Sequence, residues 1–392
     1  MSTNPFHAGR SLSPFRDQAA FGGGGRIQGE LWRAVETALL THHHEPDLQA
    51  ARGLYAALAA HVLPGQPVWP MLVAPPGSMK TDLLAALDGL PLVHLIDQVT
   101  PNTFLSGQVK DGKRPVTGNS SSLLHRIGES GIIAYPDFST LLSMNRAHRG
   151  SVLADMRRIY DGHLRKEYGT DEDRKAHEWK GRITFAVATT DEIDRYYSVF
   201  QTLGERFVMI RWHRPGGVEA ALKAMNQNCE KRSQDLKRAV HALMRELPKQ
   251  SPELSLALQE KTAALAEFAV RGRTHVHRNG HSKTIEYIPE PEAATRLAQQ
   301  LAQLAKGSAL LSGKTEVNEE DYPLVQRVAL DCIPKARRTL LEALIRGEGV
   351  DKCGLPGSTG SYVREELQAM DLLAGDALSR KARDLLAQAG VL

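Results

Sequence analysis

The sequence predicts an α/β fold with a mostly parallel β-sheet. Short apolar runs alternate with longer polar stretches of helical periodicity, which is typical of a parallel sheet covered by helices. The apolar runs lie at 68–73, 92–96, 131–135, 183–188 and 207–212. The first run leads into a Pro/Gly/Ser turn and then a helix expected over 82–87, an order of elements that is found where proteins bind phosphate.

The composition is that of a globular protein without a membrane segment. The chain has 392 residues, of which 42% are hydrophobic and 24% charged, so we expect two or three domains. Its net charge of +4 permits a nucleic-acid partner without requiring one. The three cysteines are far apart and odd in number, which argues against zinc and a disulfide framework. Without a signal peptide or a membrane-length apolar run, we expect a cytoplasmic protein with no membrane partner.

Composition shifts divide the chain into five expected parts. A Ser/Pro/Gly-rich flexible arm precedes a helical region with helices at 28–41 and 47–62, and the α/β core follows. A stretch that looks wholly helical follows the core. Three short helical patterns separated by turns end the chain, the last of them expected from Ala377 to Ala389. The expected boundaries are 1–25, 26–65, 66–215, 216–333 and 334–392. The run His42–His44 falls in a helix–helix turn, where a solvated turn is favoured over a metal site.

The turn after the first apolar run has the features of a P-loop. Lys80 would reach the β- and γ-phosphates of ATP, and the Thr81 hydroxyl would bind Mg²⁺. Ala74 and Met79 replace the two glycines of the usual G-x-x-x-x-G-K-[ST] pattern, and a left-handed Met79 would cost about 1–2 kcal/mol. The alternative is an ordinary strand–turn–helix. The expected nucleotide-binding residues of the loop are Pro76, Gly77, Ser78, Met79, Lys80 and Thr81.

Polar residues after later strands complete the expected site. Asp137 follows the run at 131–135, where it would position the attacking water, bind Mg²⁺ indirectly, or do both. Pro136 stands where a second acid is common, and the alternative for Asp137 is a turn carboxylate. Thr190, after the run at 183–188, would orient the water or simply cap the strand.

Two arginines are candidates for contacts with the γ-phosphate. Arg206, before the last apolar run, would reach the nucleotide of a neighbouring subunit and stabilise transition-state charge. Head-to-tail contacts of this kind close into rings. The alternative is a surface ion pair with Glu205 or another acid. Arg296 would fold over the nucleotide from the helical region, or be an ordinary exposed helical arginine.

Together these motifs resemble the AAA+ ATPases, and most of all the minichromosome-maintenance-type and mobile-element replicative helicases of phages and integrative elements. The resemblance covers about 65–335. It implies Walker motifs at Lys80, Thr81 and Asp137, sensor residues at Thr190 and Arg296, an arginine finger at Arg206, and a helical lid over 216–333. The stretches that carry the resemblance are Pro75–Thr81, Asp137–Asn145, Arg158–Gly162, Asp194–Val199 and Leu203–Phe207.

A hairpin inserted before the 183–188 strand is expected between 163 and 182. In ring helicases such a hairpin points into the channel and grips the nucleic-acid backbone, and phosphate contacts give sequence-independent binding. The alternative is a solvated surface hairpin with mixed charges. The expected DNA-binding residues are Arg165, Lys166, Arg174, Lys175 and Lys180.

The function that these features predict is an ATP-hydrolysing AAA+ DNA motor. It would form a ring, with a hexamer expected, and act on single-stranded or forked DNA with ATP and Mg²⁺. Segment 334–392 would be a winged-helix-like domain with a short or absent wing, or a helical packing module. The alternative function is a nucleotide-gated assembly or loader protein, or a defence- or transposition-module ATPase, that binds DNA or a protein partner without unwinding.

Overall fold

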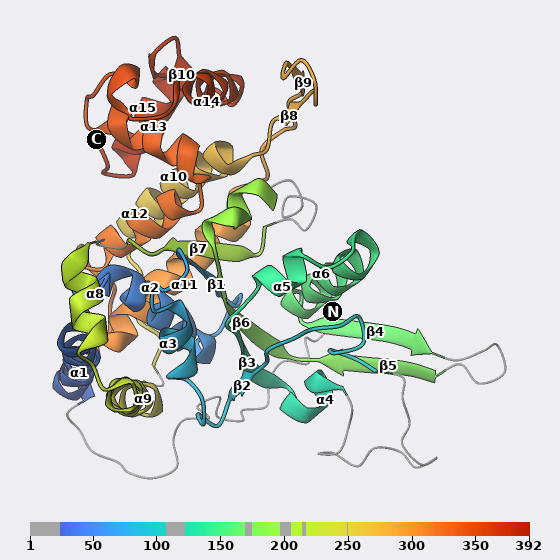
Figure 1. Cartoon of the computed structure of the whole chain (residues 1–392), viewed down its shortest axis with the longest axis vertical. Helices are drawn as coiled ribbons and strands as arrows, with labels where there is room; N and C mark the ends of the chain where they lie inside the picture. The colour runs from blue at the N-terminus through green and yellow to red at the C-terminus, as the bar shows by residue number, and fades with distance from the viewer. Residues whose placement is uncertain (1–23, 107–121, 169–174, 197–204, 214–216, 249) are drawn as a thin grey trace, which may run out of the picture.

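The centre of the protein is a five-stranded, fully parallel sheet (Figure 1). The computed structural model describes residues 24–106, 122–168, 175–196, 205–213, 217–248 and 250–392. The strands are β1 (Trp69–Val73), β2 (Val93–Leu95), β3 (Ser130–Tyr135), β6 (Arg182–Thr189) and β7 (Phe207–Arg211). Each coincides with one of the five apolar runs to within a residue or two at either end, so the prediction of a mostly parallel α/β core is confirmed.

The strand order β2-β3-β6-β1-β7 places β6 between β1 and β3. Val73, at the end of β1, lies beside Thr189 of β6, and Tyr135, at the end of β3, lies beside Val187. Parallel strands end at the same edge of a sheet, so the residues after β1, β3 and β6 meet there. Helices cover the strands, which explains why they read as continuous apolar runs rather than alternating ones.

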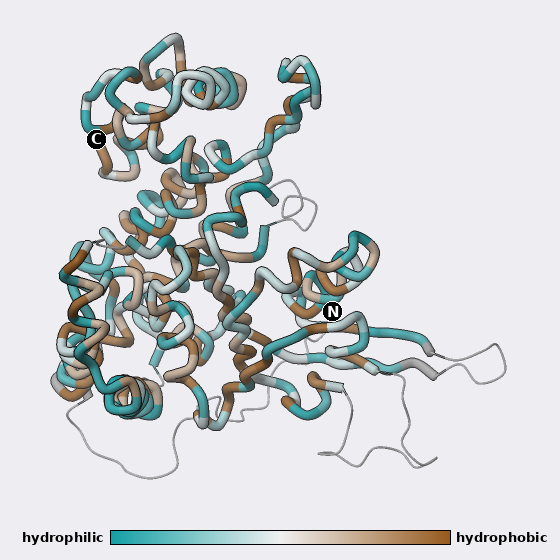
Figure 2. The backbone as a smooth tube through the Cα atoms, viewed as in Figure 1, coloured by the Kyte–Doolittle hydropathy of each residue, from teal (hydrophilic) through white to brown (hydrophobic). Residues whose placement is uncertain are grey.

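Helices before and after the sheet strands build one large hydrophobic core with it (Figure 2). Gly307 of α11 lies against the carbonyl of Ala56 in α2, where a Cβ would overlap that oxygen. The helices before β7 are α1 (Gly24–His42), α2 (Leu48–Ala59), η1 (Ala60–Val62), α3 (Lys80–Ala85), α4 (Leu123–Ile127), α5 (Ser139–Leu142), α6 (Arg146–Tyr160) and η2 (Asp191–Tyr196). Those after it are α8 (Val218–Met225), α9 (Cys229–Arg245), α10 (Leu256–Arg273), α11 (Thr295–Leu311) and α12 (Tyr322–Asp331).

The expected hairpin before β6 is present. Strands β4 (His163–Tyr168) and β5 (Lys175–Lys180) pair antiparallel and project from the body of the protein (Figure 1). The expected turn at 169–174 lies outside the described residues. Leu164 and Trp179 face each other across the hairpin and are buried, and the Trp179 indole donates to the Gly128 carbonyl at 2.6 Å.

The stretch after β7 is not wholly helical, which corrects the sequence prediction. A short antiparallel pair, β8 (His277–Arg278) and β9 (Ile285–Tyr287), interrupts it. Strands of two or three residues are too short to give a readable alternating pattern. Most of the predicted arm, residues 1–23, lies outside the described residues, and α1 already begins at Gly24. Among the described helices, none combines the length and apolar character needed to cross a bilayer.

The segment at 334–392 is mostly helical and builds a second hydrophobic core together with Phe268 of α10, Val276 and Ile333. Its helices are α13 (Lys335–Ile345), η3 (Val350–Lys352), α14 (Gly357–Ala369) and α15 (Arg380–Gln388). The two-residue strands β10 (Leu373–Ala374) and β11 (Ala377–Leu378) pair between α14 and α15. The sequence pattern predicts a last helix from 377, but this helix begins at Arg380, and the small strand pair precedes it rather than following it.

Candidate nucleotide site

The loop between β1 and α3 has a strained backbone at Met79, the residue whose left-handed conformation the sequence analysis considered. Gly77 has φ 73° and Met79 has φ 63°, both in the left-handed region. Met79 immediately precedes the first residue of α3. A side chain with a Cβ costs about 1–2 kcal/mol in this conformation. The loop therefore holds a conformation that a glycine would adopt freely, and strain of this kind is concentrated at functional sites.

Ser78 is the group in this loop that most directly indicates a ligand. It is 3% exposed, yet its hydroxyl has no hydrogen-bond partner in the protein. Buried hydroxyls are nearly always paired, so an orphan at this position fits a site that is completed by a bound polar group. A Cβ on Gly77 would meet only open space. Residues 77–82 also line a pocket of about 390 Å³.

Lys80 lies at the carboxyl edge of the sheet. Its ammonium donates to the Ala74 carbonyl at 3.0 Å and to the Thr189 carbonyl at 3.3 Å, so it spans the ends of β1 and β6. Burial lowers the pKa of Lys80, and the negative charges of Asp137 and Asp191 oppose that effect. The Lys80 ammonium is thus held at the edge by two uncharged carbonyl oxygens. A charged phosphate would bind the ammonium more strongly than these carbonyls do.

Asp137 makes the turn contact that was the alternative to a catalytic role, and it also lies beside Lys80. Its Oδ1 accepts from the Ser139 amide at 3.1 Å, which is the geometry of a turn carboxylate. The neighbouring Phe138 amide donates to the Ala188 carbonyl at 2.8 Å and anchors this turn beside β6. Asp137 therefore lies near enough to Lys80 to act on its charge while one oxygen is occupied by its own turn.

Thr190 follows β6 directly at the same edge. Its carbonyl accepts from the Ile193 amide at 3.1 Å and starts the 3-10 helix η2. Parallel strand geometry alone brings the loop, Asp137 and Thr190 together. Thr81, the second residue of α3, lines the pocket beside Lys80. Oxygen donors from Thr81 and Asp137 are of the type that Mg²⁺ accepts alongside nucleotide phosphates. No cluster of three or more His, Cys, Asp or Glu side chains suited to a metal occurs among the described residues.

Arg206 and Arg296 lie at the opposite edge of the sheet. Arg206 precedes β7, and Gln300 of α11 donates to the Arg206 carbonyl at 2.6 Å. The charge of Arg296 acts on Arg206 and on Tyr160. The five residues of β7 span roughly 15 Å at about 3.3 Å per residue. Within one chain, Arg296 and Lys80 therefore lie at opposite edges of the sheet, and Arg296 lies on the same side as Arg206.

Within one chain, the Arg206 side chain is held in an ion pair. Its guanidinium lies 3.4 Å from Asp161 and over the ring of Tyr160, and the side chain is 12% exposed. Glu205, the partner named first from the sequence, instead pairs with Arg273 at 2.8 Å. The acid that binds Arg206 is thus Asp161, which sequence proximity does not reveal.

The hairpin carries fewer available cations than the sequence suggested. Lys166 is 18% exposed, pairs with Asp155 and donates to the Pro101 carbonyl at 2.7 Å, so it holds the hairpin to the body. Arg165 and Lys180 are 61% and 75% exposed, but they pair with Glu167 and Glu178. Arg174 and the side chain of Lys175 lie outside the described residues. On the described hairpin, the two exposed cations are thus paired with two carboxylates of the same strands.

Two groups of residues near the loop were not assigned to the candidate site from the sequence. His42–His44 line the same pocket as Lys80, together with Lys223 and Arg232. Burial lowers the pKa of His43 to about 4, and the neighbouring charges of Arg232, His42 and Lys223 add to the effect. The histidine run therefore faces the candidate site, although its sequence context predicted only a turn.

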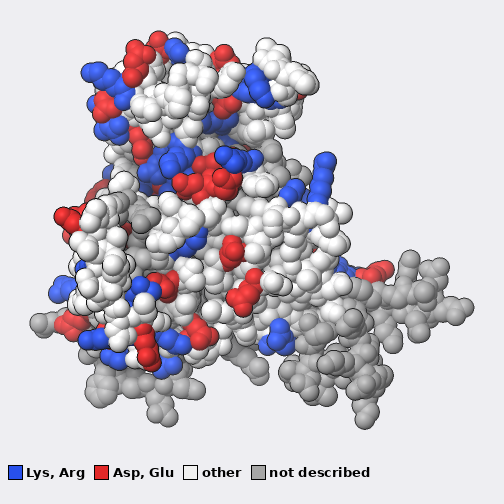
Figure 3. Space-filling model, viewed as in Figure 1, with Lys and Arg blue, Asp and Glu red and all other residues white. Residues whose placement is uncertain are grey.

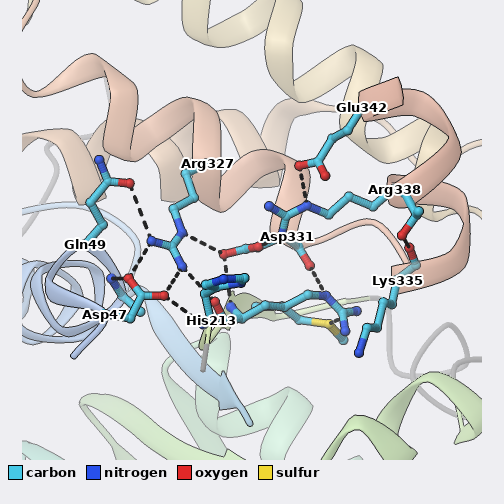
Figure 4. Close-up of polar contacts among 12 residues, drawn as sticks. Asp47, Gln49, His213, Arg327, Asp331, Lys335, Arg338 and Glu342 are labelled. Atoms are coloured by element: carbon cyan, nitrogen blue, oxygen red, sulfur yellow. Dashed lines mark hydrogen bonds and ion pairs between the residues drawn. The ribbon is translucent and has the colours of Figure 1, made fainter. Parts of the chain in front are cut away.

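A second cavity, of about 970 Å³, adjoins the loop at Pro75 and Asp191. Charged residues from the turn before α2 and from β7, α12 and α13 surround it (Figure 4). Their centre is Asp331, a fully buried residue, which contacts Arg211, Arg327 and Arg338. Figure 3 shows charged side chains of both signs gathered where the C-terminal helices meet the core. No local motif marks this network, because its members are far apart in sequence.

Comparisons with known proteins find only a weak structural similarity. No family model matches the chain, and no curated protein matches it. A solved structure of a full-length MCM homologue from Methanopyrus kandleri is 15% identical, with a TM-score of 0.44. The match covers 78% of this chain and 58% of the homologue. At this identity and score the likeness assigns no function.

Proposed function

We propose that this chain is an ATP-hydrolysing AAA+ protein that acts on DNA. The observation that carries the proposal is the loop at 74–81: a left-handed Met79, an orphan buried Ser78 hydroxyl and the Lys80 ammonium meet at the carboxyl edge of a parallel sheet. Asp137 and Thr190 follow the adjacent strands at that same edge. This combination of groups suits a triphosphate and places an acid near its end.

Each residue of the edge has a distinct role in this proposal. Lys80 exchanges its carbonyl acceptors for the β- and γ-phosphates, and Ser78 donates its hydroxyl to a phosphate oxygen. Bound Mg²⁺ would neutralise charge that develops on the phosphates. Thr81 and Asp137 would hold that ion, and the free oxygen of Asp137 would orient the attacking water. Thr190 would hold the water from the other side.

Arg206 would complete the site from a neighbouring subunit. It lies at the edge opposite to Lys80, so a head-to-tail contact brings one chain's Arg206 toward the next chain's loop. Arg296, its neighbour, would travel with it. We propose a closed ring, with a hexamer as the expected size, in which hydrolysis depends on assembly. Arg206 must then exchange Asp161 for the phosphate when the ring forms.

The remaining parts of the chain are assigned by the same proposal. The helical region at 216–333 would be the lid, and 334–392 the winged-helix-like domain that contacts DNA. The hairpin would contact single-stranded or forked DNA through Arg165 and Lys180, together with Arg174 and Lys175 as the sequence predicts. The resemblance to phage and mobile-element replicative helicases favours a translocating motor, and the protein would be cytoplasmic.

The alternative is a nucleotide-gated assembly or loader protein, or a defence-module ATPase, that does not unwind DNA. Two observations favour it. The exposed hairpin face balances two cations with two carboxylates, which weakens its attraction for phosphate. Arg206 is already paired with Asp161, so releasing it has a cost that would slow hydrolysis.

ATP hydrolysis by the purified protein, with and without single-stranded DNA, tests the proposal. We expect a DNA-stimulated rate in the wild type and loss of both ATP binding and turnover in Lys80→Ala. Lys261→Ala is a matched control, because Lys261 makes an ion pair with Glu319, away from the loop, and should leave binding unchanged. Tight ATP binding with negligible turnover would favour the assembly protein. Unchanged ATP affinity in Lys80→Ala would sink the site assignment.

A further inference from the structure

The segment that follows Thr190 is held by the first residue of α13. The Lys335 ammonium lies 3.0 Å from Asp191 Oδ2, and the Lys335 amide donates to Asp194 Oδ2 at 3.2 Å. Both carboxylates belong to η2, which begins directly after Thr190. The C-terminal helical segment is therefore joined to the edge of the sheet where the candidate site lies.

The two carboxylates that hold η2, Asp191 at its start and Asp194 toward its other end, are anchored very differently. Asp194 receives two hydrogen bonds from Arg211, at 2.6 and 3.0 Å, and Arg211 also donates to the Asp331 carbonyl at 2.9 Å. Arg211 is nearly buried and Asp331 fully so, which makes this end a fixed point. By contrast, the side chains of Asp191 and Lys335 are 40% and 65% exposed. A solvated pair of this kind breaks and reforms at little cost.

Asp191 also lies within electrostatic reach of Lys80. Its charge favours the protonated amine of Lys80, as does that of Asp137. Asp191 and Pro75 line the same cavity, and Pro75 follows the Ala74 carbonyl that accepts from Lys80. Asp191, which follows β6, is thus a second carboxylate beside the loop. After β3, Pro136 stands where a second acid is common before Asp137.

We propose that Asp191 and Lys335 are positioning residues that couple the candidate nucleotide site to the C-terminal helices. The inference rests on the proposed function of the loop at 74–81. When Lys80 binds a phosphate, its positive charge no longer compensates the charges of Asp191 and Asp137. The phosphate also adds negative charge beside Asp191. Asp191 then pairs more firmly with Lys335, which orders the first turn of α13. In return, the position of α13 sets the start of η2 and so the position of Thr190.

Hydrogen exchange with and without a non-hydrolysable ATP analogue and Mg²⁺ tests this coupling. The segments to follow are the loop at 74–81, Thr190 with η2 (190–196), and the first turn of α13 at 335–339. We expect slower exchange at all three in the wild type. In Lys335→Gln and in Asp191→Asn, we expect the loop to remain protected while the response at 335–339 falls at least about threefold. Lys335→Arg should restore that response.

Arg364→Gln is the matched control. It removes another partly exposed ion pair of the C-terminal segment, the 2.7 Å contact with Asp376, without touching η2. All three responses should persist in it. Because Lys335 is mostly exposed, Lys335→Gln should fold normally and carry the test even if Asp191→Asn does not.

The outcomes separate this inference from the proposed function. No protection at 74–81 in the wild type would overturn the nucleotide site and the coupling together. Protection at 74–81 without any response at 335–339 would overturn the coupling alone. A response at 335–339 that survives in both Lys335→Gln and Asp191→Asn would do the same, because the signal would then not pass through this pair.

Discussion

Arg206 pairs with Asp161 at the edge of the sheet opposite to Lys80. Its guanidinium lies 3.4 Å from both carboxylate oxygens and over the ring of Tyr160. Lys80, in contrast, contacts the carbonyls at the ends of β1 and β6. Since the length of β7 separates the two edges, Arg206 does not reach a phosphate at Lys80 of its own chain. Any action of Arg206 on that phosphate must be intermolecular.

This separation predicts that two inactive variants restore activity when mixed. Lys80→Ala lacks the loop cation but keeps Arg206, and Arg206→Ala has the converse defect. In a randomly mixed head-to-tail ring, about a quarter of the interfaces combine both intact groups. We expect ATP turnover of the equal mixture to approach that fraction of the wild-type rate. A mixture as inactive as its components, with rings formed, would remove the intermolecular role of Arg206.

The hairpin assignment predicts a change in the salt dependence of DNA binding. If Arg165 and Lys180 contact phosphates, the double alanine variant should bind single-stranded DNA more weakly at low salt. Its log–log salt slope should become shallower by roughly 0.7 for each phosphate that the variant no longer neutralises. The matched control is Arg238→Ala with Arg245→Ala, which removes two exposed cations from α9, outside the hairpin and the C-terminal segment. Equal slopes in both variants would mean that the described hairpin does not bind phosphate.

The left-handed conformation of Met79 predicts that its glycine variant is about as stable as the wild type and that its isoleucine variant is less stable. Met79→Gly relieves about 1–2 kcal/mol of strain from the left-handed conformation. The greater conformational entropy of the unfolded glycine chain offsets a similar free energy. We expect its free energy of unfolding to stay within about 1 kcal/mol of the wild type. Met79→Ile should be clearly less stable, because a β-branched residue is an outlier in this region. Urea denaturation measures both, and an isoleucine variant as stable as the wild type would contradict the loop conformation.

His61 predicts a loss of stability in acid. It is buried between Thr184 and Ser130, with 2.9 Å contacts to both hydroxyls, and burial, together with the charge of Arg182, lowers its pKa to about 3. Below pH 6.5 the unfolded chain binds a proton that the folded protein excludes, so stability falls as the pH decreases from 6.5 toward 3. Between pH 7 and 5 this amounts to about 2 kcal/mol.

Urea denaturation at the two pH values tests this effect. His61→Asn should lose the pH-dependent part, whereas His281→Asn, at an exposed position, should retain it. The idea would be falsified if His61→Asn and the wild type lost the same stability between pH 7 and 5.

Local patterns in the sequence were sufficient for the sheet. Each strand of β1, β3, β6 and β7 is buried on both faces, so each reads as an apolar run long enough to recognise. The strand pairs β8–β9 and β10–β11 were not predicted, because strands of two or three residues show no periodicity. Contacts elsewhere in the fold decide their pairing. The start of α15 was misplaced for the same reason, since its first turn is preceded by one of these short strands.

The contacts of the candidate site also fall into those that the sequence predicts and those that depend on tertiary packing. Lys80, Asp137 and Thr190 each follow a parallel strand, so their meeting at one edge follows from the strand pattern that the sequence carries. Tertiary structure alone decided that Arg296 lies with Arg206 at the other edge, that Lys166 is tied to Asp155, and that Lys335 binds Asp191. These contacts join residues with no common local pattern, and only the packing of helices against the sheet brings such charges together.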